Sequence, residues 1–240
     1  NWDCLEEMDK LIEQGVKVDA IITDPPYGTT ACKWDSVIPF EAMWERLNKL
    51  IKPNGAIVLF WSQPFTSALI MSNPKYFKYE LIWDKKRTME PQLANIRPMK
   101  CHENIIVFWN GRLTYNPQKT KLDKPDKRKA SWRMNNRKDW TGHNILCSVN
   151  SEDKVYNDRF PLSISRFSNA NQKEKTHPTQ KPVALMEYLI KTYTNEWETV
   201  LDFTMWSWST GVATKNINRD FIGIELDENY FKIAQERINN

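Results

Sequence analysis

Short apolar runs that stop at polar or turn-forming residues alternate along this chain with segments of helical periodicity. The run VDAIITDPPYG at 18–28 is apolar up to Asp24 and then meets two prolines, which fix φ and restrict the residue before them. Similar runs are AIVLFW at 56–61, ETVLDF at 198–203 and FIGIEL at 221–226. Strands that alternate with helices predict a doubly wound α/β fold, with a mainly parallel sheet covered on both faces.

Helical spacing predicts five helices, at 39–52, 65–72, 181–194, 209–218 and 228–238. Two more apolar runs predict strands at 79–86 and 103–110. From about 111 to 176 the periodicity fades and Lys, Arg, Asn, Ser and Pro dominate, so this stretch is expected to be rich in loops.

Composition excludes several classes of protein. The 240 residues fit one domain or one domain with a sizeable insertion, and 40% hydrophobic residues suffice for a core. No segment approaches the ~20 apolar residues of a membrane span, so no membrane partner is expected. Four scattered cysteines without a CxxC pair and only three histidines make a zinc site unexpected. Free thiols in a reducing cytoplasm are the simplest interpretation.

Charge is distributed unevenly. Between Lys85 and Phe160 there are 17 basic and 8 acidic residues, a local charge of +9, whereas the whole chain carries +4. An acidic body that carries a basic segment favours a polyanionic partner such as nucleic acid. The alternative is a solvated charged surface without a partner.

The tetrapeptide Asp24-Pro25-Pro26-Tyr27 follows the first predicted strand, and ligands of open α/β sheets lie at the carboxyl ends of strands. Asp24 and the Pro25 carbonyl can accept both hydrogens of an exocyclic amine, and this localises the nitrogen lone pair. Tyr27 can stack on a base that has left its helix. The alternative is an Asp-Pro turn with a surface tyrosine.

Two further motifs follow later in the chain. THPTQKP at 176–182 precedes a predicted helix, and without a ligand it would be a turn with a proline-initiated helix. Glu225 lies 23 positions after Asp202, close to the spacing of an acid that binds ribose hydroxyls in a βαβ nucleotide unit. That spacing alone is weak, because exposed acids at strand ends are common.

Taken together and in this order, the motifs resemble one family. DCLEEM at 3–8, DPPY, LFWSQPF, HPTQKP, LDFTMWSWST and FIGIELDENYFKIAQERI resemble the S-adenosylmethionine-dependent amino-methyltransferases of DNA, N6-adenine or N4-cytosine, in the permuted class whose catalytic motif precedes the cofactor motif. The resemblance implies a Rossmann-like methyltransferase fold and direct methyl transfer to DNA without a covalent enzyme intermediate. DPPY, rather than a Ser-led motif, is more typical of the adenine members.

The resemblance also implies residue roles. In the catalytic motif Asp24 and Pro25 would activate the amine, Pro26 would stiffen the turn and Tyr27 would stack on the base. The cofactor would be held by Asp3, Cys4, His177, Thr179, Gln180, Lys181, Asp202, Phe203, Thr204, Ser209, Thr210 and Glu225. The basic segment would contact DNA through Lys85, Lys86, Arg87, Arg97, Lys127, Arg128, Lys129, Arg133, Arg137 and Lys138.

Four tryptophans depart from the family pattern. Trp2, Trp61, Trp206 and Trp208 stand where the family has glycine, in loops expected around the cofactor. Glycine permits φ > 0 and lets the backbone approach a ligand, and tryptophan does neither without cost. We therefore expect impaired binding of S-adenosylmethionine, unless the loops rearrange and the indoles point to solvent.

The resemblance divides the chain into a catalytic half at 1–84, an inserted target-recognition segment at 85–175 and a cofactor-binding half at 176–240. Double-stranded DNA is the expected partner, and a second copy of the chain and a cognate restriction nuclease are further candidates. Two alternatives to adenine methylation stay open. One is an N4-cytosine methyltransferase, and the other is a catalytically inactive, methyltransferase-like DNA-binding protein.

Overall fold

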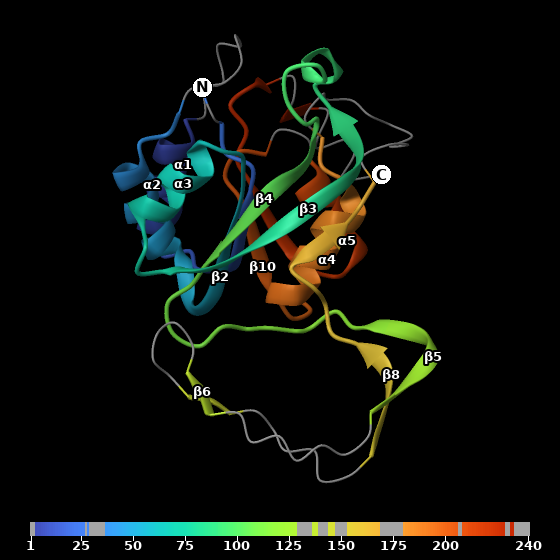
Figure 1. Cartoon of the computed structure of the whole chain (residues 1–240). Coiled ribbons are helices and arrows are strands. Elements are labelled where there is room, and N and C mark those ends of the chain that lie inside the picture. Colours follow the sequence, from blue (N-terminus) through green and yellow to red (C-terminus); the bar gives the residue numbers. More distant parts are fainter. Residues whose placement is uncertain are drawn as a thin grey trace. The chain divides into compact units, whose positions relative to one another are not determined.

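A seven-stranded sheet in the order β11-β10-β1-β2-β4-β3-β9 forms the centre of the computed structural model (Figure 1). Its parallel part consists of β11 (Asp220–Gly223), β10 (Thr199–Asp202), β1 (Val18–Thr23) and β2 (Ile51–Trp61). The sheet continues with β4 (Lys100–Phe108), β3 (Phe77–Met89) and β9 (Ile164–Arg166). β4 is antiparallel to both neighbours, and β9 is parallel to β3. The predicted α/β class with a mainly parallel sheet is confirmed.

The structure describes residues 3–26, 28, 37–128, 136–138, 144–146, 153–168, 180–205, 208–228 and 231–232. Tyr27, His177 and Thr179 of the predicted site, and Trp2, Trp206, Lys129 and Arg133, lie outside these residues, as does most of the predicted helix at 228–238. Among the helices of the described ranges, none has the length and apolar character of a membrane span.

Helices cover both faces of the sheet (Figure 1). One face packs against α1 (Cys4–Glu13), α2 (Phe40–Leu50) and α3 (Phe65–Ser72), and the other against α4 (Val183–Tyr193) and α5 (Ser209–Asn216). In α2 the buried residues Met43, Trp44, Leu47 and Leu50 recur at helical spacing and form its inner stripe. All six residues of β1 are buried, as expected for a parallel strand between two helical layers.

The chain changes direction between β1 and β10. From β1 it runs through α2 to β2 on one side, and from β10 it runs through α5 to β11 on the other. β1 and β10 are parallel neighbours, with Ala20 opposite Val200 and Ile21 opposite Leu201. Their carboxyl ends therefore meet at the topological switch point, where open α/β sheets bind their ligands.

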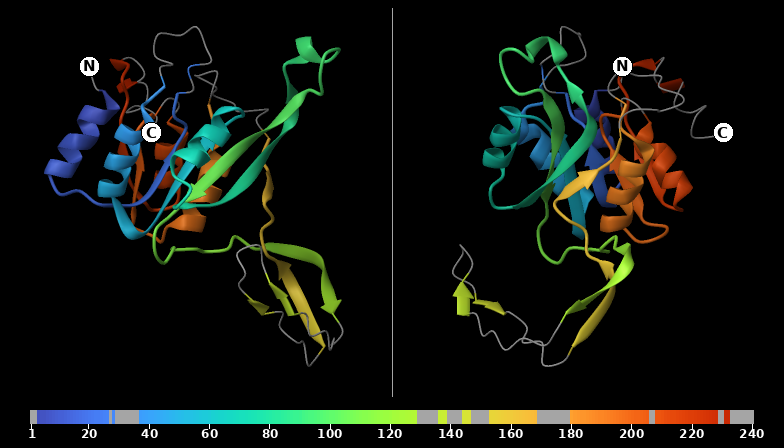
Figure 2. Two further views of the ribbon diagram at one scale, coloured as in Figure 1. Left: turned by 60° about the vertical axis from the view of Figure 1, so that its left-hand side comes forward. Right: turned by 45° about the vertical axis from the view of Figure 1, so that its right-hand side comes forward.

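β3 and β4 form a hairpin that continues past the carboxyl end of β2 (Figure 2). Trp61, the last residue of β2, pairs with Asn104, so residues 100–103 of β4 lie beyond the end of β2. The hairpin closes through a short 3-10 helix, η1 (Pro91–Leu93). Glu103 of β4 faces Trp83 of β3 at the base of this extension.

A second compact unit spans residues 117–161. It contains two antiparallel pairs, β5 (Thr120–Arg128) with β8 (Lys154–Arg159), and β6 (Asn136–Lys138) with β7 (Asn144–Leu146). The expectation of a loop-rich stretch at 111–176 is therefore wrong for these segments. The predicted target-recognition segment at 85–175 spans parts of both units and stays a prediction. Residues 85–116 belong to the first unit, because β4 and the end of β3 pair within the large sheet.

Candidate active site at the ends of β1 and β10

Asp24 follows the last residue of β1, and Asp202 is the last residue of β10. Three hydroxyl contacts join these two strand ends. Thr23 Oγ1 donates to Asp202 Oδ1 at 2.6 Å and lies 2.7 Å from Thr204 Oγ1, and Thr204 Oγ1 donates to the Asp24 carbonyl at 3.2 Å. Pro25 and Pro26 are buried beside Asp24. The strand ends thus hold two carboxylates in one place.

Asp202 is a buried carboxylate with several hydrogen-bond donors. Thr210 Oγ1 donates to Asp202 Oδ2 at 2.6 Å, and the Thr204 amide donates to Oδ1 at 3.3 Å. Burial raises the pKa of Asp202 to about 6, although these hydrogen bonds work in the opposite direction. A carboxylate in this setting would be stabilised by a cationic ligand.

Glu225 lies two residues beyond the end of β11 and is 8% exposed. Its Oε1 accepts from the Asp227 amide at 2.9 Å. Burial raises the pKa of Glu225 to about 7. The acid is at the predicted strand end, but little of it can be reached by solvent or by a ribose hydroxyl.

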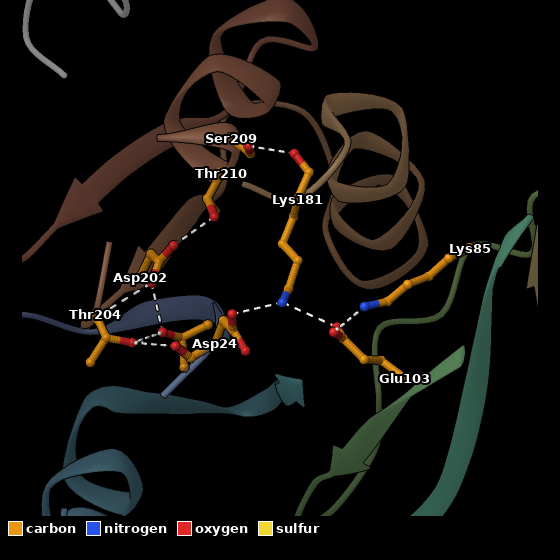
Figure 3. A network of polar contacts seen from close by, with 9 residues as sticks. Asp24, Lys85, Glu103, Lys181, Asp202, Thr204, Ser209 and Thr210 are labelled. Atoms are coloured by element: carbon orange, nitrogen blue, oxygen red, sulfur yellow. Dashed lines mark hydrogen bonds and ion pairs between the residues drawn. The ribbon is translucent and has the colours of Figure 1, made fainter. Parts of the chain in front are cut away.

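Lys181 contacts Asp24 directly (Figure 3). Its Nζ lies 2.7 Å from Asp24 Oδ2 and 3.1 Å from Glu103 Oε2, and Lys85 Nζ pairs with the other oxygen of Glu103. Burial opposes ionisation of Glu103, but the two ammonium groups outweigh it and lower the pKa of Glu103 to about 2. The side chain of Lys181, predicted to surround the cofactor, is thus an ion-pair partner of Asp24.

Lys85 requires a correction. It was expected among the DNA-contacting residues, but it is only 5% exposed and its ammonium pairs with Glu103. Its Nζ also lies 5.0 Å from the centre of the Trp83 ring. Lys85 therefore belongs to the polar network of the site and is not available for a phosphate.

A small cavity of about 20 Å³ lies between the strand ends. Its lining brings together six predicted site residues with two apolar ones: Asp24, Lys181, Asp202, Thr204, Ser209, Thr210, Phe60 and Met186. Ser209 Oγ donates to the Lys181 carbonyl at 2.6 Å, which ties the first residue of α5 to the segment before α4. A cavity of this size holds about one water molecule and no nucleoside.

Other predicted residues do not line this cavity. Asp3 caps α1, with its Oδ1 accepting from the Leu5 amide at 2.8 Å, and burial raises the pKa of Cys4 to about 11. Phe203 is fully buried in the core beneath α1, α2 and α3, and Gln180 is buried just before Lys181. Glu103 was not among the predicted site residues. In the sequence it is only an isolated acid at the start of an apolar run.

The other basic residues expected to contact DNA are distributed over both units. Lys86, Arg87 and Arg97 are exposed in the β3–β4 hairpin, where Arg97 pairs with Glu90 at 2.5 Å. In the second unit, Lys127 is exposed on β5. Arg128 lies in β5, and Arg137 and Lys138 lie in β6.

Trp208 occupies the N-cap of α5 in a left-handed conformation, with φ 62° and ψ 0°. A bulky residue in this region carries strain that glycine avoids. The indole is 2% exposed and packs with Met205, Phe221 and Phe231. Its Nε1 is buried and has no hydrogen-bond acceptor among the described residues.

Trp61 occupies a different environment. It is the last residue of β2, is 2% exposed and lies in the core beneath α1, α2 and α3. Its ring centre lies 6.0 Å from that of Phe40. Trp61 and Trp208 thus both point into packed apolar surroundings and not to solvent. Neither lines the 20 Å³ cavity.

Comparison with known proteins places these features in a family. Residues 18–236 match the model of the N6/N4 methyltransferase family, described as DNA methylase. The chain is 27% identical to the type II methyltransferase M1.MboII of Moraxella bovis, over 99% of this chain and 94% of that protein. It is 28% identical to M.HpaI of Haemophilus parainfluenzae, over 93% of this chain and 68% of that protein.

Among solved structures, the M1.HpyAVI–SAM complex superposes with a TM-score of 0.69 at 28% identity, over 99% of this chain and 97% of that one. The donor set of the present site fits such a cofactor, because Asp202 and Glu225 can accept from an ammonium group and from hydroxyls. Among the residues that the structure describes, the cavity beside Asp202 is near the size of one water and Glu225 is 8% exposed.

Proposed function

This chain belongs to the DNA methylase family that modifies N6 of adenine or N4 of cytosine, and on that premise we propose that its site is built for N6 of adenine in double-stranded DNA. The family uses S-adenosylmethionine, which supplies the methyl group. The observation that carries the proposal is Asp24 at the carboxyl end of β1, beside the Asp202 end of β10. DPPY is more typical of adenine members than of cytosine members.

In the proposed site Asp24 and the Pro25 carbonyl accept the hydrogens of the target amine, which localises the nitrogen lone pair. Pro26 stiffens the turn, and Tyr27 stacks on the extrahelical base. Asp202, which already accepts from Thr23 and Thr210, would face the methionine part of the cofactor, and Glu225 would face its ribose. These residues orient the target base and the cofactor, and they exclude water. No covalent enzyme intermediate is needed.

We further propose that the chain as written binds S-adenosylmethionine weakly. Trp208 packs with Met205 and Phe221, and Glu225 after β11 is 8% exposed. An acid that binds ribose hydroxyls must be reachable, and little of Glu225 is exposed. Trp2 and Trp206 stand at two more positions where the family has glycine, and they are also expected to weaken the binding of S-adenosylmethionine.

DNA contact is proposed for the exposed basic residues of the β3–β4 hairpin and of the unit at 117–161. Lys86, Arg87 and Lys127 carry uncompensated positive charge on exposed side chains in the described ranges of these segments. Such residues bind phosphates and release counterions. A homodimer, a cognate restriction nuclease and a cytoplasmic location stay predictions of the same proposal.

Methyl transfer, together with binding of DNA and of S-adenosylmethionine, tests the function. Labelled methyl transfer to unmethylated genomic DNA, followed by nucleoside analysis, should yield N6-methyladenine after Trp206 and Trp208 are changed to glycine, and little product before. Recovery of N4-methylcytosine would assign the cytosine reaction instead. A chain that binds DNA, but neither binds S-adenosylmethionine nor methylates after this double reversion, would be a non-catalytic DNA-binding protein.

A further inference from the structure

Four charged side chains of alternating sign cross the site in a row (Figure 3). Asp24 follows β1, Lys181 precedes α4, and Glu103 and Lys85 lie on β4 and β3. Lys181 and Lys85 are 7% and 5% exposed, so the row is largely out of water. Two positive and two negative charges balance, as buried ions require.

Lys181 holds a position between two acceptors. Its Nζ lies 2.7 Å from Asp24 and 3.1 Å from Glu103. Aromatic rings form the walls of this position, since Nζ lies 5.1 Å from the centre of the Phe60 ring and 5.8 Å from that of Trp83. If Lys181 Nζ moved by well under one bond length, it would lie closer to one carboxylate and farther from the other.

A target amine needs the Asp24 carboxylate as a hydrogen-bond acceptor, and in the described structure that carboxylate is engaged by Lys181. A buried ammonium left without any carboxylate would be strongly destabilised. Glu103 offers Lys181 a second partner, and Lys85 fixes Glu103 from its other oxygen. The site can therefore turn Asp24 toward a substrate without leaving a charge unpaired.

We propose that Lys181 and Glu103 are positioning residues for Asp24: Lys181 orients the carboxylate before a base arrives, and Glu103 retains the Lys181 ammonium when a target amine engages Asp24. The inference rests on the proposed amine-accepting role of Asp24. It replaces the predicted side-chain contact of Lys181 with the cofactor, and it gives Glu103 and Lys85 a role that no sequence motif indicated.

The proposal predicts the direction in which each substitution moves the titration of Asp24. The charged groups around Asp24 in the described residues are Lys181, Glu103, Lys85 and Asp202. Removing the positive neighbour should disfavour the ionised form of Asp24, whereas removing the negative Glu103 should favour it. The two substitutions should therefore move the titration of Asp24 in opposite directions.

The measurement is carbon-detected NMR titration of the Asp24 carboxyl in the full chain, without cofactor or DNA. Lys181→Met should move the midpoint to higher pH by about 1 to 3 pH units, and Lys181→Arg should leave it near the unaltered value. Glu103→Gln should move it to lower pH. If Lys181→Met does not fold, the downward shift in Glu103→Gln decides alone, and its absence would overturn the proposal.

Lys52→Met is the matched control. Lys52 Nζ pairs with Asp19 at 2.8 Å at the other end of the same strand, so its loss should leave the Asp24 titration in place. No shift in Lys181→Met, or shifts of the same sign in Lys181→Met and Glu103→Gln, would overturn the proposal. The titration needs no methyl transfer, so an inactive protein with these signed shifts would overturn only the proposed function.

A second readout separates positioning from cofactor contact. In the Trp206→Gly, Trp208→Gly background, Glu103→Gln should lower kcat at saturating S-adenosylmethionine, and calorimetry should give a cofactor Kd that changes less than about twofold. A tenfold loss of cofactor affinity, which corresponds to 1.4 kcal/mol, with unchanged kcat would assign the network to the cofactor and contradict the positioning role.

Discussion

The two strand ends that meet at the site differ in whether their buried polar groups have partners and whether their backbone is strained. At the end of β1, the Asp24 carboxylate has an ammonium at 2.7 Å, and its carbonyl accepts from Thr204. After β10, Trp208 holds a left-handed backbone, and its buried indole nitrogen has no acceptor among the described residues. Strain and an unsatisfied buried donor each cost about 1–3 kcal/mol. The end of β1 is thus well compensated, whereas the backbone and the indole of Trp208 after β10 are not.

This difference can be compared with the positions at which the chain departs from its family. The carboxylate, the prolines and the lysine of the β1 side are in place, and their buried charges are balanced. The departures fall on the glycine positions of the loop after β10 and on Trp2 and Trp61. Trp206 and Trp208 follow β10, Trp61 ends β2 and Trp2 precedes α1. The departures are therefore not confined to one strand end, but they spare Asp24, the two prolines and Lys181.

The largest expected effect is on the β1 side. In the background with Trp206 and Trp208 changed to glycine, Asp24→Ala should lower methyl transfer by at least about 10²-fold, because it removes an acceptor aimed at the reacting amine. Labelled-methyl incorporation measures the loss, and DNA affinity should be unchanged. Asp9→Ala is the control, since Asp9 pairs with Arg46 on the α1–α2 side of the sheet. Full activity of Asp24→Ala would remove Asp24 from the mechanism.

The next effect concerns the basic segment. Neutralising Lys127, Arg128 and Lys129 together should flatten the dependence of DNA affinity on salt, by about 0.9 in the log–log slope for each phosphate that the variant no longer neutralises. Fluorescence anisotropy with duplex DNA over a series of salt concentrations gives the slope.

The matched control neutralises three helix lysines, Lys10, Lys49 and Lys191, which are also exposed. It carries the same change in net charge, so the global attraction to DNA falls equally. An equal slope for the two triple variants would show that residues 127–129 make no specific phosphate contacts.

The smallest effect is on stability and tests the β10 side. Burial raises the pKa of Glu225 to about 7, above its value in an unfolded chain, so the folded state binds more protons between about pH 4 and pH 7. Stability should therefore fall as pH rises through this window. Glu225→Gln should remove this fall and stabilise the fold at pH 8 by about 1–3 kcal/mol, with little effect at pH 4.

Urea unfolding at the two pH values measures the difference. The exposed neighbour Glu228 is a suitable control, because Glu228→Gln should change stability little at either pH. A Glu225→Gln variant with the pH dependence of the unaltered chain would mean that the acid is solvated. In that case the low exposure of Glu225 would no longer support the proposal of a closed cofactor site.

The sequence predicted the parts of the site that local chemistry defines. The apolar run before Asp24 marks a buried strand, and the two prolines mark its end, so the position of Asp24 follows from adjacent residues. Asp202 could be placed in the same way. The sheet order then brings the two together, because β1 and β10 are parallel neighbours.

The rest depends on contacts between distant segments. Glu103 and Lys181 are far apart in sequence, and the register of β3 with β4, which sets Glu103 opposite Trp83, is not readable from either strand alone. Lys85 looked like a surface lysine because it stands in a basic run. It is buried because Trp83 and Glu103 cover it.

The most direct test of the account is calorimetric titration of the unaltered chain and of the Trp206→Gly, Trp208→Gly variant with S-adenosylmethionine. Each overpacked position costs about 1–3 kcal/mol, so the double reversion should tighten binding by roughly 10²-fold. Reverting Trp2 and Trp61 as well should add less than proportionally, since all four changes are expected around one site. Micromolar binding by the unaltered chain that does not change on reversion would contradict the claim that this loop closes the cofactor site.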